Sequence, residues 1–281
     1  MHTSLRHEVA ESRVGRIGLA ILALVVLGAV MAPLLGRFPP LQQSTASLLP
    51  PSMEHWLGTN QVGQDIWSRL LYGARTSLFV GLSVGVLNVA LGVLLGVSAA
   101  LVGGIFERVV MRMVDALIVI PSVLVVILAA AYLRPSLPIL ILLLAGLSWP
   151  SSARIIRAQA LALKESGHIA AARTFGAGGI YVARRHIVPD LGPILVVEFI
   201  YAVRRAVFME AGLAFLGIGD PSMVSWGAMM HNAMGFSYLD VWQWWLVPTG
   251  LALSLTIVGL TFVSYAAETV LDPRLQGAEI A

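Results

Sequence analysis

Six long apolar stretches divide the chain and limit its fold more than any other feature of the sequence. Each is close to the roughly 20 residues that an α-helix needs to cross the hydrocarbon core of a bilayer. Within lipid every backbone N–H and C=O group needs an internal partner, and a run of this length meets that need as a helix. We therefore predict an all-α, polytopic membrane protein with six transmembrane helices, over residues 17–35, 78–102, 116–133, 137–153, 191–216 and 241–267.

The composition agrees with a chain that lies in lipid. Charged residues make up 12% of the sequence and hydrophobic residues 58%, whereas an average soluble domain has about 25% charged residues. Lys164 is the single lysine, and the remaining basic residues are arginines spread along the chain. This pattern is unlike the basic tail of a protein that binds DNA or RNA. We expect the lipid bilayer, and no nucleic acid, as a partner.

Motifs for catalysis are missing from the sequence. The chain has no G-x-x-x-x-G-K-[ST] loop, which would be needed to cradle the phosphates of ATP. Its six histidines lack the spacing of zinc-protease motifs, and there is no cysteine to act as a nucleophile or metal ligand. We expect this chain not to be an enzyme, and we expect no catalytic residue, metal or cofactor in it. Any work that needs ATP and Mg²⁺ would be done by a partner.

The apolar stretches suggest three parts: 1–77, 78–272 and 273–281. The first part holds an N-terminal tail, the first transmembrane helix and a long extracytoplasmic loop with a proline-rich, extended start. That loop ends in an amphipathic segment, residues 65–72, which we expect either to lie on the membrane surface or only to orient the second transmembrane helix. The second part is a five-helix core with a cytoplasmic loop at 164–190, and the third part is a C-terminal tail.

The basic residues predict the orientation in the membrane, because cytoplasmic loops carry an excess of lysine and arginine. With both termini in the cytoplasm, the outer segments hold only Arg37, Arg69, Arg75 and Arg134. The cytoplasmic segments then hold most basic residues, namely Arg6, Arg13, Arg16, Arg108, Arg112, Arg154, Arg157, Lys164, Arg173, Arg184, Arg185 and Arg274. We therefore place both termini and the arginine-rich loop in the cytoplasm.

The cytoplasmic loop predicts a helix–turn–helix below the membrane. An alanine run favours a helix over residues 165–175, and Gly176 can end it by taking a left-handed conformation. A second helix is expected at 180–187, ending before Pro189. The small alanine side chains would let the first helix sit deep in a groove of another protein.

Residues 170–189 resemble the cytoplasmic loop of ABC-importer permeases, whose pattern is E-A-A-x-x-x-G-x(9)-I-x-L-P. Ala171, Ala172, Gly176 and Pro189 match this pattern, while Ala170 stands where the family has glutamate. The resemblance implies a coupling helix that docks on an ATPase. Its contact residues would be Ala170, Ala171, Ala172, Arg173, Phe175 and Gly176.

Further stretches are similar to the C-type permease subunits of peptide and nickel importers. They are Leu57-Gly-Thr-Asn-Gln-Val-Gly-Gln-Asp65, Arg112-Met-Val-Asp115 with Ile120-Pro121, Glu210-Ala-Gly-Leu-Ala-Phe-Leu-Gly-Ile-Gly219 and Ser225-Trp-Gly227. The first departs from the family's L-G-T-D-x-x-G-R-D at Asn60 and Gln64.

This resemblance implies a type I importer permease core in the inner membrane of a prokaryote. Its partners would be a second, homologous permease subunit, two cytoplasmic ATPase subunits and an extracytoplasmic substrate-binding protein. The expected cargo is di- or oligopeptides, with nickel or a metal chelate as the alternative. A secondary transporter working alone would show inverted repeats, and a membrane scaffold would not need the glycine-terminated cytoplasmic helix.

The fifth apolar stretch carries four charged residues: Glu198, Arg204, Arg205 and Glu210. The two arginines lie about 20 Å along the helix from residue 191, near the bilayer centre. An arginine at that depth costs at least about 2.5 kcal/mol on insertion scales, so it should face protein or water. The four residues either form an intramembrane ion pair or partner contact, or line the translocation path. Glu198 and Arg205 are seven residues apart and share one face.

Overall fold

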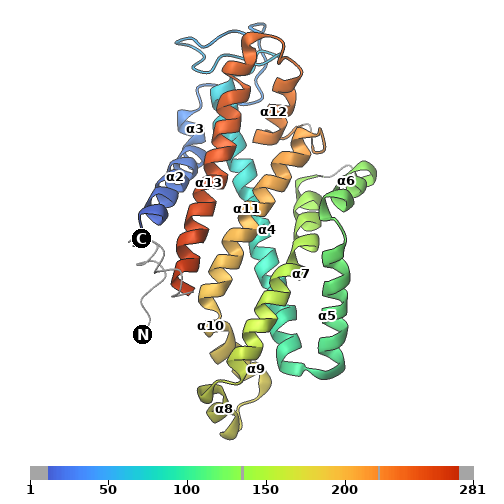
Figure 1. Ribbon diagram of the computed structural model, residues 1–281. Coiled ribbons are helices and arrows are strands. Elements are labelled where there is room, and N and C mark those ends of the chain that lie inside the picture. The colour runs from blue at the N-terminus through green and yellow to red at the C-terminus, as the bar shows by residue number, and fades with distance from the viewer. Residues whose placement is uncertain (1–11, 134–135, 221, 272–281) are drawn as a thin grey trace, which may run out of the picture.

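The computed structural model describes residues 12–133, 136–220 and 222–271. Throughout these residues the regular structure is helical, apart from one isolated β-bridge between Thr59 and Asp65. The longer helices run side by side in an elongated bundle, with α8 and α9 at one end and α12 at the other (Figure 1). Arg6, Arg134, Arg274 and the tail at 273–281, on which part of the predicted topology rests, lie outside the described residues.

The helices follow one another with short connections except after α3 and α11. Their bounds are α2 (Arg13–Val30), α3 (Ala32–Leu35), α4 (Ile66–Val102), α5 (Gly104–Val119), α6 (Ser122–Leu133), α7 (Leu137–Lys164), α8 (Gly167–Thr174), α9 (Gly179–Val182), the π-helix η1 (Ala183–Ile187), α10 (Val188–Asp190), α11 (Gly192–Phe215), α12 (Trp226–Met234), the 3₁₀-helix η2 (Asp240–Gln243) and α13 (Leu246–Leu271).

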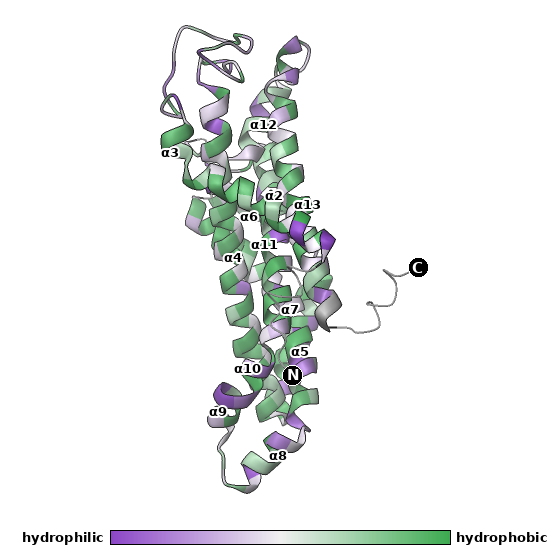
Figure 2. Ribbon diagram, turned by 90° about the vertical axis from the view of Figure 1, so that its left-hand side faces the viewer, coloured by the Kyte–Doolittle hydropathy of each residue, from purple (hydrophilic) through white to green (hydrophobic). Residues whose placement is uncertain are grey.

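Length and composition allow the predicted six membrane spans. Four single segments qualify, namely α2, α4, α7 and the segment Asp240–Glu268 that contains η2 and most of α13. Two bent pairs qualify when each is counted as one span: α5 with α6, bent by 79°, and the segment Gly179–Asp190 with α11, bent by 68°. Figure 2 shows hydrophobic residues along the middle of the bundle and hydrophilic residues gathered towards its two ends.

The second span is longer than predicted. Residues 65–72 do not form a separate helix on the membrane surface, because α4 is continuous from Ile66 to Val102. Its first turns are covered by protein, since Ile66 packs in one cluster with Trp226 of α12 and Trp245. Ser68 and Arg69, which the amphipathic pattern placed away from the apolar face, are also buried. The segment therefore starts the span itself, and the predicted division at residue 77 falls inside α4.

The third span is not one straight helix over 116–133. It consists of α5 and α6, which meet at a sharp bend next to Pro121. The residue before a proline is sterically kept out of the helical region, and Ile120 accordingly has an extended backbone with φ −75° and ψ 123°. Arg108 and Arg112, expected in a loop, therefore lie within α5.

The fourth span continues well past its predicted end at residue 153, to Lys164. The added turns carry Arg154 and Arg157, which form ion pairs with Asp115 and Glu107 of α5. Because these charges form ion pairs between two neighbouring helices, the residues that carry them do not need to lie in a loop. A run of apolar residues ends where charges begin, so hydropathy alone placed the end of the helix too early.

Glycines on α4 allow close helix packing. A Cβ atom at Gly81 or Gly85 would meet Val203 of α11 at 3.2 Å or less, and one at Gly92 would meet Ile156 of α7 at 2.9 Å. At Gly96 the nearest group is the backbone of α7, with the carbonyl oxygen of Ala153 at 2.7 Å. These small residues therefore let α7 and α11 pack closely against α4.

We predict that Gly96→Ala destabilises the protein by about 1–3 kcal/mol, as overpacking typically does. The new methyl group would press on backbone atoms of α7, which cannot rotate away as a side chain can. The measurement is the midpoint of thermal unfolding in detergent. Gly146→Ala is the matched control, because a Cβ there meets nothing within 4 Å. Equal midpoints for the two variants would show that the close approach of α4 and α7 is unimportant.

Candidate functional site

The cytoplasmic loop contains the predicted short helix. Helix α8 covers Gly167–Thr174, within the expected range 165–176. Gly176 has φ +85°, the left-handed conformation that glycine adopts without a steric cost. The N–H of Ala177 donates to the carbonyl oxygen of Ala172 at 3.0 Å, which closes the end of the helix.

The second half of the loop differs from the prediction. The helix does not end before Pro189, because α9 continues through η1 into α10 and reaches Asp190. In η1 the N–H of Val188 donates to the carbonyl oxygen of Ala183, five residues back. Pro189 then lies in the first turn of α10, where its missing N–H is not needed. The wider turn therefore lets the chain pass a proline without a break.

Buried apolar residues hold the loop against the bundle. Ile169, Val182 and Ile187 are fully buried in one cluster with Val97 of α4 and Ile156 of α7. Outside this cluster, Nε2 of His168 lies 3.0 Å from Oδ2 of Asp190 and so links α8 to α10. The loop is thereby fixed to α4 and α7, and its two halves are joined to each other.

The opposite side of the loop is open. Ala170, Ala171, Arg173 and Gly176 are exposed and Ala172 is half-buried. Phe175 is 90% exposed, and Ile180 and Tyr181 beside it are 79% and 56% exposed. An exposed apolar group of this kind is typical of an interaction site. The motif alone did not single out Ile180 and Tyr181; their signal was a large apolar side chain directly after a glycine turn.

Glu198 is held inside the bundle by a serine. Its Oε2 accepts a hydrogen bond from Oγ of Ser152 at 2.6 Å, and that Oγ accepts one from Nδ2 of Asn88 at 2.8 Å. The three side chains are buried and join α11, α7 and α4. Sequence analysis found Glu198 but not the serine that binds it.

The two arginines of α11 have different surroundings. Nη2 of Arg205 donates to Oγ of Ser122 on α6 at 3.2 Å, and the Arg205 side chain is exposed. Nη1 of Arg204 donates to Oγ1 of Thr261 on α13 at 3.2 Å, and its guanidinium group lies 4.7 Å from the ring centre of Tyr201. In the described part of the chain, no ion pair joins any two of the four charged residues. Glu198 and Arg205 do share a face, but each reaches a different helix.

Both arginines line hollows in the surface of the bundle. A hollow of about 210 Å³ has a polar lining that includes Asn88, Ser148, Ser151, Ser152, Glu198 and Arg205. A second hollow of about 460 Å³ lies between α11 and α13 and is lined by Tyr201, Arg204, Arg205, Phe208, Ile257 and Thr261. Glu210 lies farther along α11, buried, and accepts a hydrogen bond from Oγ of Ser77 at 2.9 Å.

A comparison with family models matches residues 92–277 to the binding-protein-dependent transport system inner membrane component family. The chain belongs to this family. The matched residues include the cytoplasmic loop and all four charged residues of α11. The chain is thus a multi-pass, inner-membrane transport subunit and not an enzyme.

Similar proteins cover nearly the whole chain. A putative peptide transport system permease protein of Brucella suis is 40% identical over 265 residues, which are 93% of this chain and 88% of the relative. The oligopeptide transport system permease protein of Bacillus subtilis is 35% identical over 95% of this chain and 87% of its own length. A probable D,D-dipeptide transport system permease protein of Escherichia coli is 36% identical over 92% of this chain and 87% of its own length.

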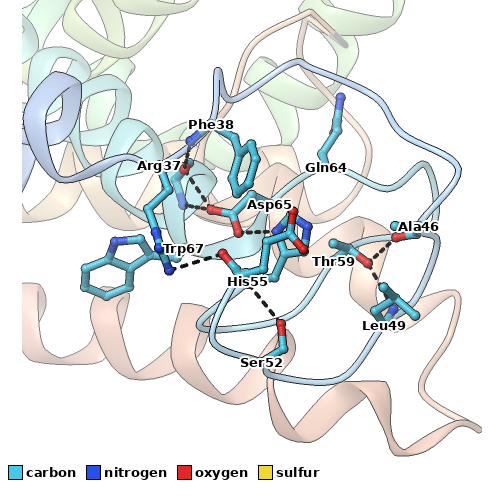
Figure 3. Close-up of polar contacts among 12 residues, drawn as sticks. Arg37, Phe38, Ala46, Leu49, Ser52, His55, Thr59, Gln64, Asp65 and Trp67 are labelled. Atoms are coloured by element: carbon cyan, nitrogen blue, oxygen red, sulfur yellow. Dashed lines mark hydrogen bonds and ion pairs between the residues drawn. The ribbon is translucent and has the colours of Figure 1, made fainter.

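The outer loop of this family member, which precedes the matched residues, is held by its own hydrogen bonds (Figure 3). The carboxylate of Asp65 accepts the N–H of Ser68 at 2.8 Å, which caps α4, and lies 2.9 Å from Nδ1 of His55. Oγ1 of Thr59 accepts the N–H of Leu49 at 2.9 Å. These contacts fix the start of α4 at the outer end of the bundle.

The two departures from the family pattern in this loop contact each other. Nδ2 of Asn60 donates to Oε1 of Gln64 at 2.8 Å, and Arg69 donates to the same oxygen. Where the pattern has Asp and Arg, this chain has two amide side chains that bind each other. The guanidinium group of Arg69 shares the acceptor oxygen of Gln64.

We predict that Ser152→Ala lowers stability by about 1–3 kcal/mol, the usual cost of leaving a buried polar group without its partner. The change removes the donor to Glu198 and the acceptor for Asn88 in one step. The measurement is again the thermal midpoint in detergent. Ser151→Ala is the control, since Ser151 lines the same hollow but has no side-chain hydrogen bond in the described structure. If both variants unfold at the same temperature, the chain of hydrogen bonds across α4, α7 and α11 does not stabilise the fold.

Proposed function

We propose that this chain is one permease half of an ATP-driven, binding-protein-dependent importer of di- or oligopeptides. The observation that carries the proposal is the anchored cytoplasmic loop with its exposed apolar tip of Phe175, Ile180 and Tyr181. The side of the loop that packs on α4 and α7 would transmit movement to the bundle. The exposed apolar side offers a surface for another protein. The peptide cargo is supported by the names of the similar permeases.

The proposed complex contains two permeases and two ATPases. A second, homologous permease pairs with this chain, two cytoplasmic ATPase subunits dock on the coupling loops, and an extracytoplasmic binding protein delivers the peptide. ATP and Mg²⁺ are bound by the ATPase subunits. We also place both termini of this chain in the cytoplasm, because the segments that would then be cytoplasmic carry the excess of arginine.

The geometry suggests how movement passes from the ATPases to the membrane. Helix α8 is tied to α10 by His168 and Asp190, and α10 leads directly into α11 through a 68° bend. A displacement of α8 when the ATPases close would therefore swing α11, which carries the charged residues. This is the motion that alternating access requires of a wall of the path.

Purification of the tagged chain with its neighbours tests the proposal. We expect an ATPase and a second permease to copurify, and we expect peptides to stimulate ATP hydrolysis in the presence of the binding protein. Stimulation by nickel or a metal chelate in place of peptides would favour the alternative cargo. Transport by the chain alone, without an ATPase, would make it a secondary transporter.

We predict that Gly176→Val uncouples ATP hydrolysis from uptake in that complex. A β-branched residue at φ +85° carries strain of about 1–3 kcal/mol, which the loop would relieve by moving its tip. Uptake per ATP hydrolysed should fall. Gly178→Val is the matched control, because Gly178 has φ −71° and a Cβ there meets nothing within 4 Å. Normal uptake by an assembled Gly176→Val complex would contradict the docking role.

We further propose that Arg204 and Arg205 face the interior of the permease pair and not lipid, and that they line the path of the peptide. Their hydroxyl partners and the polar residues of the two hollows support a polar site, which the second permease would cover. Guanidinium groups there would favour cargo with a carboxylate, such as the C-terminus of a peptide. The competing role is a permanent contact with acidic groups of the second permease, which would hold the subunits together.

Replacing both arginines with glutamine separates these roles. A path role predicts assembled complexes that lose their preference for a free C-terminus over an amidated one, measured by uptake of both peptides. A scaffold role predicts poor assembly, measured by size-exclusion chromatography. Arg108→Gln is the control, because Arg108 is an exposed arginine of α5 away from both hollows. Guanidinium groups in contact with lipid tails in a structure of the complex would refute both roles.

A further inference from the structure

The outer end of the bundle contains a cavity of about 260 Å³ that none of the roles above uses. It is lined by residues of α4, α7, α11 and α12 and of the segment between α11 and α12. Its polar lining consists of Arg69, Glu210, Asp220, Ser225, His231 and Asn232. Leu137 and Leu140 of α7 form an apolar part of the wall.

Glu210 is deeply buried in this lining, at 3% exposed. Its contacts are with hydroxyl groups, and no cation lies within ion-pair distance of it in the described residues. Arg69 lines the same cavity, but its Nη1 donates to the carbonyl oxygen of Pro40 at 3.0 Å and to Gln64. A buried carboxylate without a cation is costly. The cavity thus presents an acceptor that lacks its counter-charge.

Two further acceptors face the same cavity. Asp220 accepts the N–H and the hydroxyl of Ser222 at 2.9 and 2.6 Å, and these hydrogen bonds hold the pKa of Asp220 below its usual range. His231 has Nδ1 at 2.8 Å from the carbonyl oxygen of Phe215. With Nδ1 as the donor of a neutral ring, Nε2 is left as an acceptor. The lining therefore offers two carboxylates and a ring nitrogen.

The hollows along α7 and α11 differ in size. The one next to the outer cavity measures only about 20 Å³, and it is lined by apolar residues such as Val126 and Leu144 together with Ser122, Ser148 and Arg205. Ser148 and Arg205 also line the hollow of about 210 Å³ that contains Glu198. The outer cavity is therefore much larger than the hollow next to it.

We propose that the outer cavity is an entry subsite for a primary ammonium group, namely the free amino end of a peptide. An ammonium group has three N–H donors, and Glu210, Asp220 and Nε2 of His231 supply acceptors for them. The ammonium group also provides the counter-charge that Glu210 lacks. This inference rests on the proposed import of peptides and adds which end of the peptide this subunit recognises first.

The test compares a dipeptide that has a free amino end with its N-acetylated form, both radiolabelled. Uptake is measured in vesicles that contain the complete importer with its binding protein. Any selection by the binding protein is the same for every permease variant, so it cancels when variants are compared. Glu210→Gln keeps an oxygen for Ser77 but removes the charge. We expect it to lower uptake of the free dipeptide at least about tenfold and to leave uptake of the acetylated form unchanged.

Asp220→Asn is a second test variant, because Asp220 lies outside the helices and is not needed for their packing. It should reduce the preference for the free amino end in the same direction but less strongly. Asp240→Asn is the control, since Asp240 is an exposed carboxylate near the same end of the bundle but outside the cavity. It should behave as the unmodified chain does.

Equal loss of both peptides in assembled Glu210→Gln complexes, or normal uptake of the free dipeptide, would overturn the proposal. If Glu210→Gln does not assemble, Asp220→Asn decides by the same criterion. If the unmodified importer barely takes up the acetylated form, the two test variants are compared with Asp240→Asn by their rates of uptake of the free dipeptide. Rates equal to that of Asp240→Asn would then overturn the proposal. A complete importer that takes up neither peptide would refute the peptide cargo itself, which is a different outcome.

Discussion

The cost of placing charges in a lipid-embedded helix governs the arrangement of this protein. Helix α11 carries four charged residues within its apolar sequence, and each is met by a hydroxyl group from a different helix. The pairs are Glu198 with Ser152 of α7, Arg204 with Thr261 of α13, Arg205 with Ser122 of α6, and Glu210 with Ser77 of α4. Neutral hydroxyl groups satisfy hydrogen bonds without cancelling charge. Helix α11 is thereby positioned by its neighbours while its charges stay available to a ligand or a partner.

The features that could be predicted from the sequence are those set by local interactions. Apolar runs located the membrane-spanning helices, since hydrophobicity over about 20 residues needs no knowledge of neighbours. Gly176 was predicted to take a left-handed conformation because few other residues do so without strain. The resemblance of the cytoplasmic loop and the outer motifs gave the family, which the comparison confirms.

The features that were missed depend on groups far apart in the chain. Hydropathy placed the start of α4 too late because Ser68 and Arg69 are covered by α12 and the outer loop, which no local pattern reveals. Glu198 and Arg205 share a face of α11, but their hydrogen-bond partners are Ser152 of α7 and Ser122 of α6, which the sequence of α11 alone does not indicate. The outer cavity combines residues from four helices, so no motif marks it. The roles of the coupling residues and of the four charges remain predictions.

The uninterrupted length of α4 has a mechanical consequence. A helix of 37 residues is about 55 Å long, almost twice the roughly 30 Å thickness of the hydrocarbon core. One end begins in the hydrogen-bonded outer loop at Asp65, and the other packs through Val97 against the cytoplasmic loop. A single continuous helix is therefore long enough to reach both faces of the membrane. Tilting of α4 would transmit a movement from one side of the bilayer to the other directly, without a series of side-chain rearrangements between them.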